Sequence, residues 1–268
     1  MNQEYMTLDE IHQELLGMLQ DFHKLCNQLD IKYFLSGGSL LGAIRHQGFI
    51  PWDDDLDIMM LREDYVKLIE NREQLDGKYR LSSLETVSDW QYPFAKIDLI
   101  STYIDDEYRD VQHGLFIDIF PIDNLPDDPE RQNEICKKIR RLDFLRGSGT
   151  KKAFRPSEKH RVIKNLIKPY ANVLGPNYFA RKINRLALKI NQENQQSNTM
   201  GVAVVSTHGT KEFLSAKAFS QAVEVSFEKE IATIPIGYEE YLGNLYGDYM
   251  QLPPEKDRIP AHYKILRK

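Results

Sequence analysis

The chain of 268 residues carries 35 Lys and Arg against 40 Asp and Glu, a formal net charge of −5, and 41% of its residues are hydrophobic. This balance is typical of a globular protein with one large domain or two modest ones, and it excludes the broad basic surface that nucleic-acid binding needs. The sequence has no apolar run of membrane-spanning length and its start lacks a secretory signal pattern, so we expect a cytoplasmic protein without a transmembrane segment.

The first half of the chain alternates helical and strand-like patterns. Thr7 and Glu10 form a capping box ahead of a helix with regularly spaced apolar residues. A short strand should then end in the glycine pair at 37–38, and Gly48 should close the helix that follows. Later elements are predicted as a strand at 55–61, a helix at 62–75 and strands at 78–85, 94–104 and 114–120.

The second half is predicted to be mainly helical and more basic. A Pro- and Asp-rich turn at 121–130 ends the mixed region near residue 128, and helical patterns fill most of residues 129–196. The basic residues of this part fit either a solvated face or a surface for an anionic acceptor or a membrane. The remaining elements are predicted as strands at 202–206 and 225–237 and a helix at 238–250.

The stretch at 53–57, DDDLD, holds the residues most indicative of chemistry. Asp55 and Asp57 are two residues apart, so on a strand both carboxylates would lie on one face, about 6.5–7 Å apart. Buried like charges are costly without a cation, and Mg²⁺ typically takes one or two carboxylates together with substrate phosphates. A calcium loop is disfavoured because Ile58 stands where its turn requires glycine, and a solvent-facing turn is the remaining alternative.

A second motif lies about 20 residues upstream, where a predicted strand ends in Ser36, Gly37, Gly38 and Ser39 before a helix. A helix N-terminus attracts anions, glycines allow close backbone approach, and the two hydroxyls can bond phosphate oxygens. Together with the aspartate pair, this turn predicts one site for a metal ion and a phosphate.

Three further features add to this site. Asp118 stands alone in an apolar strand, which indicates a third metal ligand or a base that takes a proton from an attacking hydroxyl, although a paired core residue is also possible. Arg45, beyond the Gly-Gly helix, and Lys96, in another apolar strand, are candidates for phosphate oxygens, with a surface salt bridge as the alternative for each. Trp52, directly beside the acids, is an aromatic candidate for ligand binding.

The sequence resembles the LicD family. The resemblance covers about residues 28–260 and rests on four motifs in the family's order: SGGSLLGAIRHQGFIPWDDDLDI at 36–58, FAKIDL at 94–99, GLFIDIFPID at 114–123 and YLGNLYGDYMQLPP at 241–254. It implies an α/β (α+β) fold of the nucleotidyltransferase-like superfamily, which also includes fukutin-like proteins. Residues 1–128 would form the mixed-sheet catalytic core with its N-terminal helix, and residues 129–268 a largely helical half completing the domain.

The resemblance also implies an activity. Bacterial members use CDP-choline to place phosphocholine on sugars of teichoic acid or lipopolysaccharide, with CMP as the leaving group. The quaternary ammonium of choline is bound best by aromatic faces, which makes Trp52 a candidate to contact it. The superfamily's Gly-Ser turn corresponds to Gly37, Gly38 and Ser39, its acid pair to Asp55 and Asp57, and its third acid to Asp118. The expected cofactor is Mg²⁺, with Mn²⁺ as an alternative. The expected acceptor is a glycan precursor, lipid-linked and reached by peripheral contact at the inner face of the membrane.

Two other functions remain open at this point. The same acids would serve a nucleotidyltransferase that moves NMP from an NTP to a small hydroxyl compound, releasing pyrophosphate. A non-catalytic nucleotide-binding subunit is disfavoured, because a degenerate site need not keep three costly acids. The sequence also leaves open the roles of Asp53 and Asp54, and whether Tyr241, Tyr246 and Tyr249 form a choline cage or pack in the core.

Overall fold

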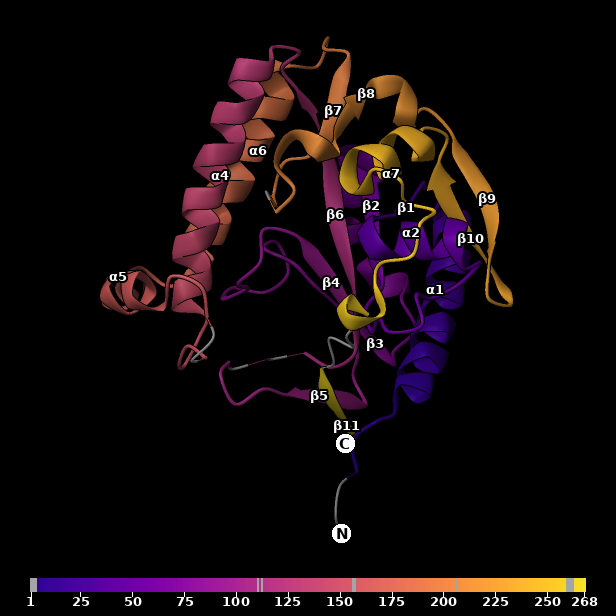
Figure 1. Ribbon diagram of the computed structural model, residues 1–268, viewed down its shortest axis with the longest axis horizontal. Coiled ribbons are helices and arrows are strands. Elements are labelled where there is room, and N and C mark those ends of the chain that lie inside the picture. Colours follow the sequence, from indigo (N-terminus) through magenta and orange to yellow (C-terminus); the bar gives the residue numbers. More distant parts are fainter. Residues whose placement is uncertain (1–3, 110, 112, 156–157, 206, 259–262) are drawn as a thin grey trace.

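A mixed sheet forms the centre of the computed structural model, which describes residues 4–109, 111, 113–155, 158–205, 207–258 and 263–268 (Figure 1). β2 and β6 run parallel, whereas the other neighbouring strands are antiparallel, so the predicted α/β class with a mixed sheet is confirmed. The strands of the central path are, in spatial order, β1 (Phe34–Leu35), β2 (Asp57–Leu61), β6 (Phe116–Leu125), β4 (Ala95–Leu99) and β3 (Tyr79–Ser82).

The parallel pair β2 and β6 lies at the middle of this sheet. Ile58, Met59 and Met60 of β2 are all fully buried, because helices cover both faces and a strand in that position needs apolar residues on both sides. β6 continues through Pro121 to Leu125, so the turn predicted at 121–130 starts too early. Pro121 is tolerated in this central strand because the pairing of β6 with β4 ends at Ile119, and pairing with the next neighbour begins only after the proline.

Helices flank the sheet on two sides. Figure 1 shows α4 and α6 side by side to one side of β6, and α1 to the other. The predicted capping box of α1 is present, with Thr7 and Glu10 bonded to each other's backbone. α2 begins already at Gly37 and ends at Arg45, so Gly48 does not close it. The helices are α1 (Leu8–Leu29), α2 (Gly37–Arg45), α3 (Arg62–Glu70), α4 (Pro129–Gly149), α5 (Arg161–Leu174), α6 (Pro176–Glu193) and α7 (Tyr238–Tyr246).

The last third of the chain returns to the sheet that residues 34–125 build. β7 (Thr199–Val202) pairs with the end of β6, and β8 (Phe213–Ser215) pairs with β7. The strand predicted at 225–237 is a hairpin of β9 (Ala222–Phe227) and β10 (Glu230–Pro235). The strand predicted at 202–206 is replaced by β7, which ends at Val202, and residue 206 lies outside the described part. Short 3₁₀ helices span Arg72–Gln74, Gly209–Glu212, Ala216–Phe219 and Glu255–Asp257.

The predicted strand at 94–104 is two strands, because the chain turns at residues 100–101 between β4 and β5 (Thr102–Asp105). β5 pairs with β11 (Lys264–Arg267), a strand that the sequence did not reveal. Within the described residues, no helix has both the length and the apolar character needed to cross a bilayer. Cys26 and Cys136 are both free and buried in helices.

Candidate active site

The turn between β1 and α2 lies against two of the predicted acids. Gly37 has φ +51°, a left-handed conformation that glycine adopts without strain. A Cβ atom on Gly38 would stand only 2.7 Å from Asp53 Oδ2, and one on Gly37 would stand 3.5 Å from Asp57 Oδ2. The two glycines therefore allow carboxylates to approach the N-terminus of α2, where the helix dipole favours negative charge.

The two serines of this turn are buried and have partners within the protein. Ser39 Oγ accepts a hydrogen bond of 2.9 Å from the backbone N–H of Asp57. Ser36 Oγ lies 3.0 Å from the Tyr241 hydroxyl, in hydrogen-bond contact. In this arrangement the predicted phosphate-binding hydroxyls fix the turn to β2 and α7, and the position of Asp57 depends directly on Ser39.

Asp57 and Asp118 stand side by side on the parallel strands β2 and β6, in direct register. Asp55 precedes β2 by two residues, and Leu56 between the two acids is fully buried on the opposite side. Burial, reinforced by the charges of Asp53 and Asp118, raises the pKa of Asp55 to about 7. Burial and the same kind of repulsion raise the pKa of Asp57 well above its ordinary value. We call Asp53, Asp55, Asp57 and Asp118 the acid cluster.

The structure separates Asp53 from Asp54, which the sequence left ambiguous. Asp53 approaches Gly38, and burial together with the Asp54 charge raises its pKa. Asp54 is 3% exposed and its carboxylate accepts a 2.7 Å hydrogen bond from the backbone N–H of Tyr263. Asp53 therefore belongs with the carboxylates at the glycine turn, whereas Asp54 holds the segment that leads into β11.

Lys96 lies on β4 opposite Asp118 and forms an ion pair with it. The ammonium is almost fully buried and stands 3.4 Å from the ring centroid of Phe116 and 4.8 Å from that of Tyr92. These rings replace part of the ammonium's lost hydration through cation–π attraction. Burial raises the pKa of Asp118, and the Lys96 charge opposes that shift. The predicted phosphate ligand thus lies inside the site, already paired with its third acid.

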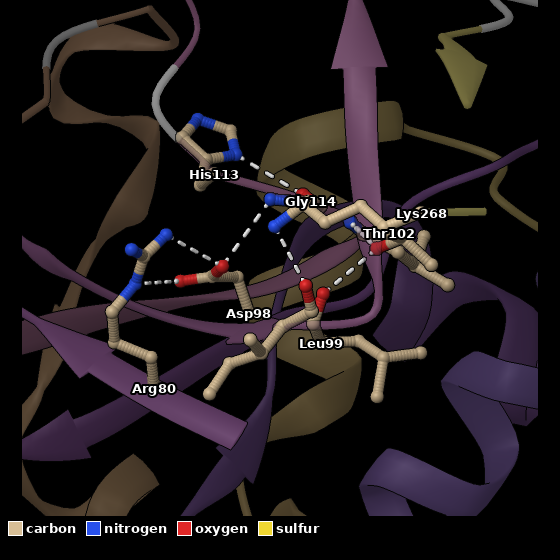
Figure 2. A network of polar contacts seen from close by, with 9 residues as sticks. Arg80, Asp98, Leu99, Thr102, His113, Gly114 and Lys268 are labelled. Atoms are coloured by element: carbon tan, nitrogen blue, oxygen red, sulfur yellow. Dashed lines mark hydrogen bonds and ion pairs between the residues drawn. The ribbon is translucent and has the colours of Figure 1, made fainter. Parts of the chain in front are cut away.

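A polar network behind Lys96 fixes the connection between β4 and β6 (Figure 2). Asp98 lies two residues after Lys96 on β4. Its two carboxylate oxygens bind the guanidinium of Arg80, and one of them also accepts a hydrogen bond from the Gly114 N–H. Thr102 bonds to the Leu99 carbonyl and to the N–H of residue 115. Because β4 and β6 carry Lys96 and Asp118, this network holds the ion pair in register.

Tyr241 and Glu212 support the glycine turn from the other side, and sequence reasoning did not assign them this role. The Tyr241 hydroxyl accepts a 3.3 Å bond from the Gly37 N–H and contacts Glu212 Oε1 at 3.3 Å. Tyr241 is 1% exposed, so it packs in the core and is not part of a choline cage. Burial raises the pKa of Glu212 to about 7. The periodicity of residues 238–250 indicated a buried helix face, but it could not reveal that Tyr241 contacts Ser36 and Gly37, which lie 205 and 204 positions earlier in the chain.

A cavity of about 800 Å³ opens on one side of the acid cluster. Arg45 and Trp52 both line it, together with Gly38 and Asp53. The Arg45 guanidinium donates hydrogen bonds to the carbonyls of Tyr249 and Gln251, at 3.0 and 3.3 Å. Arg45 therefore braces the segment after α7 that forms the far wall. That wall contributes Tyr246, Asp248, Tyr249, Gln251, Leu252, Pro253, Pro254 and Arg258.

A second cavity, of about 780 Å³, opens on the other side of the cluster. Asp53, Asp54 and Asp55 form its inner end. Its outer walls carry both signs of charge and come from β5, the loop after it, the segment before α5 and the start of β11. These wall residues include Asp105, Asp106, Glu107, Tyr108, Arg109, Lys151, Arg155, Glu158, Tyr263 and Lys264. Asp53 lines both cavities, so two ligands could meet at the acid cluster.

The donor set fits a hard divalent cation. The four carboxyl groups of the acid cluster offer oxygen ligands. Among the described residues, the ion pair that reaches this cluster is the one between Lys96 and Asp118. No three His, Cys, Asp or Glu side chains in the described ranges converge closely enough to hold a metal alone. A cation here would therefore take some of its ligands from substrate phosphates, the mode typical of Mg²⁺.

Comparison with known proteins agrees with these features. A family model described as LicD/FKTN/FKRP, nucleotidyltransferase domain, matches residues 30–146, which include the glycine turn and the whole acid cluster. A 47-residue stretch is 51% identical to human ribitol 5-phosphate transferase FKRP, covering 18% of this chain and 9% of that protein. A 54-residue stretch is 50% identical to an uncharacterized protein of Rickettsia prowazekii, covering 20% of each.

A longer match extends over nearly the entire chain. The protein is 34% identical over 262 residues to the lipopolysaccharide cholinephosphotransferase LicD of Haemophilus influenzae, and the alignment covers 96% of each chain. The four sequence motifs are thus part of a similarity that extends over nearly the whole chain. The protein belongs to the LicD family.

Proposed function

We propose that this enzyme is a phosphotransferase that moves phosphocholine from CDP-choline to a sugar hydroxyl of a lipopolysaccharide-type or teichoic-acid-type glycan precursor, with release of CMP. The observation that carries the proposal is the buried acid cluster against the N-terminus of α2, in a chain that aligns over 96% of its length with a lipopolysaccharide cholinephosphotransferase. We further propose that the reaction takes place in the cytoplasm, at the inner face of the membrane when the acceptor is lipid-linked.

The proposed cofactor is Mg²⁺, with Mn²⁺ as an alternative. Asp55 and Asp57 would hold it together with phosphate oxygens of the substrate. Asp118 would be a third ligand only after the carboxylates move closer together, since no three of the described acids converge on one point. When bound, the cation would neutralise charge that develops on the diphosphate as CMP leaves. Asp55 and Asp57 would hold the cation beside the phosphates, and the N-terminus of α2 would add the attraction of its dipole. Gly38 leaves the space in which a phosphate oxygen can approach the backbone.

The acceptor hydroxyl oxygen forms a bond to the choline-bearing phosphorus, and the bond from that phosphorus to the bridging oxygen breaks, so that CMP departs with the electron pair. The hydroxyl proton passes to a carboxylate of the acid cluster. Asp118 is the candidate for this role in place of metal ligation, because its ion pair with Lys96 favours the ionised form against the effect of burial.

We assign the donor to the cavity lined by Arg45 and Trp52. A quaternary ammonium cannot donate N–H bonds and is met best by aromatic faces. Trp52, Tyr246 and Tyr249 supply such faces within one cavity that also reaches Gly38 and Asp53. The acceptor would then enter by the second cavity, where Arg109, Lys151 and Arg155 can contact phosphate or sugar groups of a glycan precursor.

The test is a product analysis with purified enzyme, Mg²⁺, CDP-choline and candidate glycan acceptors. We expect CMP in the nucleotide fraction and an added phosphocholine on the acceptor by mass spectrometry. Pyrophosphate from CTP, with a nucleotide attached to a small hydroxyl compound, would instead establish the nucleotidyltransferase alternative. Nucleotide binding without turnover on any acceptor would indicate a non-catalytic subunit, and either of these results would overturn the proposal.

A further inference from the structure

Helix α5 exposes an apolar face at the periphery of the molecule. Figure 1 shows the helix end-on beside the lower end of α4, well apart from the central sheet. Positions 162, 166, 170 and 173 recur at helical spacing, so they share one side of the helix. The exposed fractions of the large apolar residues are 73% for Val162, 51% for Ile163, 76% for Leu166, 58% for Tyr170 and 85% for Val173.

The other side of α5 holds the helix to the protein. Ala171 is its fully buried residue, and its backbone packs against Gly149, where a Cβ atom would stand 3.2 Å from the Ala171 carbonyl oxygen. Lys164 reaches back to Glu158 at 2.7 Å, and Lys168 donates to the Lys152 carbonyl. α5 is therefore anchored through Ala171 and its lysines, with the half-buried Ile167 and Leu174 and the edge of Tyr170, whose ring lies 6.4 Å from that of Phe179, while Val162, Leu166 and Val173 stay mostly exposed.

The charge around this face is opposite to that of the whole protein. Residues 150–175 contain seven Lys and Arg and one acidic residue, Glu158, so this segment carries a net +6 in a chain of net −5. Lys159 and Arg161 at the start of the helix are exposed. Exposed apolar residues bordered by Lys and Arg are the features of a helix that lies in the plane of an anionic membrane surface.

We propose that the face formed by Val162, Ile163, Leu166, Tyr170 and Val173 docks onto the surface of an anionic lipid bilayer, with the neighbouring cations contacting headgroups. A symmetric contact with a second copy of the chain is disfavoured, because it would bring two segments of +6 charge together. Tyr170 suits such an interface, since its ring is apolar and its hydroxyl can stay in water.

This docking has a consequence that rests on the proposed function. Lys151, Arg155 and Glu158, which precede α5 directly, form one wall of the second cavity. Docking through α5 would hold the mouth of that cavity beside the bilayer, where the head of a lipid-linked acceptor lies. A lipid-linked acceptor would then reach the acid cluster without leaving the membrane.

The test is co-sedimentation of the full-length protein with vesicles, a measurement that needs no turnover and is therefore independent of the proposed reaction. We expect the protein to bind vesicles of mixed phosphatidylglycerol and phosphatidylcholine at least tenfold more tightly than vesicles of phosphatidylcholine alone. The double variant Leu166→Ser/Val173→Ser should bind the anionic vesicles at least tenfold more weakly than wild type, because each exchange removes apolar surface from the bilayer contact.

The matched control is Val66→Ser/Ile231→Ser, which changes two residues of 42% and 50% exposure away from α5 and both cavities. This control should bind vesicles as wild type does. Failure of the wild-type protein to sediment with anionic vesicles, or equal binding by the α5 double variant, would overturn the proposal. A wild-type dimer in sedimentation velocity that the α5 variant dissociates, without vesicle binding, would assign the face to a second copy and also overturn it.

Discussion

The acid cluster and helix α5 depart from the usual inside–outside arrangement in opposite directions. The cluster buries like charges at the centre of the fold, where the pKa of Asp55 rises to about 7 and the pKa of Asp57 lies well above its ordinary value. Helix α5 instead exposes five large apolar residues to solvent. Each arrangement is unfavourable for an isolated chain in water.

The difference between the two regions indicates what each one binds. Buried carboxylates become favourable when a cation and a phosphate-bearing ligand enter, so the cluster is suited to a small charged substrate. An exposed apolar face bordered by cations becomes favourable against an extended anionic surface. Substitutions in the acid cluster should therefore change both the free energy of unfolding and the rate of transfer. Substitutions on the α5 face should change neither the free energy of unfolding nor the turnover of a soluble substrate.

The largest effect is expected for Asp57→Asn. The exchange removes the central charge of the cluster, so phosphocholine transfer should fall about a thousandfold or more, on the order of 4 kcal/mol in activation free energy. In excess chelator at pH 8 the same variant should unfold at a higher temperature than wild type, because it removes a buried like charge. Steady-state assays and thermal unfolding followed by circular dichroism measure the two effects.

The control for this exchange is Asp54→Asn. The new amide keeps an oxygen that can accept the Tyr263 N–H, so the contact of residue 54 with the segment before β11 can be kept. Transfer should fall less than tenfold. A loss as large as that of Asp57→Asn would show that Asp54 belongs with the catalytic acids, and near-wild-type turnover of Asp57→Asn itself would remove the cluster from the mechanism.

Glu212 separates the effect of burial from that of like-charge repulsion. Its pKa of about 7 exceeds the ordinary 4.5, so the folded state binds the proton more tightly than the unfolded state and stability falls as pH rises between these values. The resulting loss in the free energy of unfolding is about 3 kcal/mol at pH 8. In the Glu212→Gln variant, stability should fall less between pH 4.5 and pH 8 than in wild type, because the titrating carboxyl group is gone. Urea unfolding of both proteins from pH 4.5 to pH 8 checks it, and parallel pH profiles would contradict it.

Gly38→Ala tests whether the glycine turn is the space through which phosphate approaches. The added Cβ would stand 2.7 Å from Asp53 Oδ2, so the Asp53 side chain must move while the fold is kept. Transfer should fall about 10- to 100-fold, roughly 1.4–2.8 kcal/mol in activation free energy. Gly17→Ala, where the Cβ meets nothing within 4 Å, is the control. It should leave the rate unchanged and stabilise α1 by up to about 1 kcal/mol.

The smallest effect concerns α5. Leu166→Ser/Val173→Ser should change the free energy of unfolding by less than about 0.5 kcal/mol, because both side chains are mostly exposed in the folded protein. Turnover of a soluble acceptor should also equal that of wild type. A substantial loss of stability in urea would mean that these residues pack against the protein in solution, and the contrast between the two regions would then disappear.

The parts of the site that depend on local sequence could be predicted. The spacing of Asp55 and Asp57 and the glycine pair before a helix report on backbone geometry within a few residues, and Asp118 stands out within its apolar strand. The register that sets Asp118 beside Asp57, and the ion pair of Asp118 with Lys96, depend on pairing between distant strands. No local pattern in the sequence determines such pairing.

The same limit explains what the sequence missed. Tyr241 and Glu212 reach the glycine turn only because the chain returns to the sheet after residue 199, and β11 forms only because β5 offers it a partner. Pro121 suggested a turn, but the neighbouring strands leave its missing N–H without consequence. The serines at 36 and 39 were predicted as phosphate ligands from their position, whereas their partners come from α7 and β2.

The central claim, a cation-dependent transfer at the acid cluster, is tested most directly by following CMP release from CDP-choline with a glycan acceptor while the divalent cation is removed and restored. We predict CMP and phosphocholine-bearing acceptor in equal amounts with Mg²⁺, no detectable transfer in excess EDTA, and recovery when Mg²⁺ or Mn²⁺ is added beyond the chelator. A full rate of transfer in excess EDTA would contradict the account.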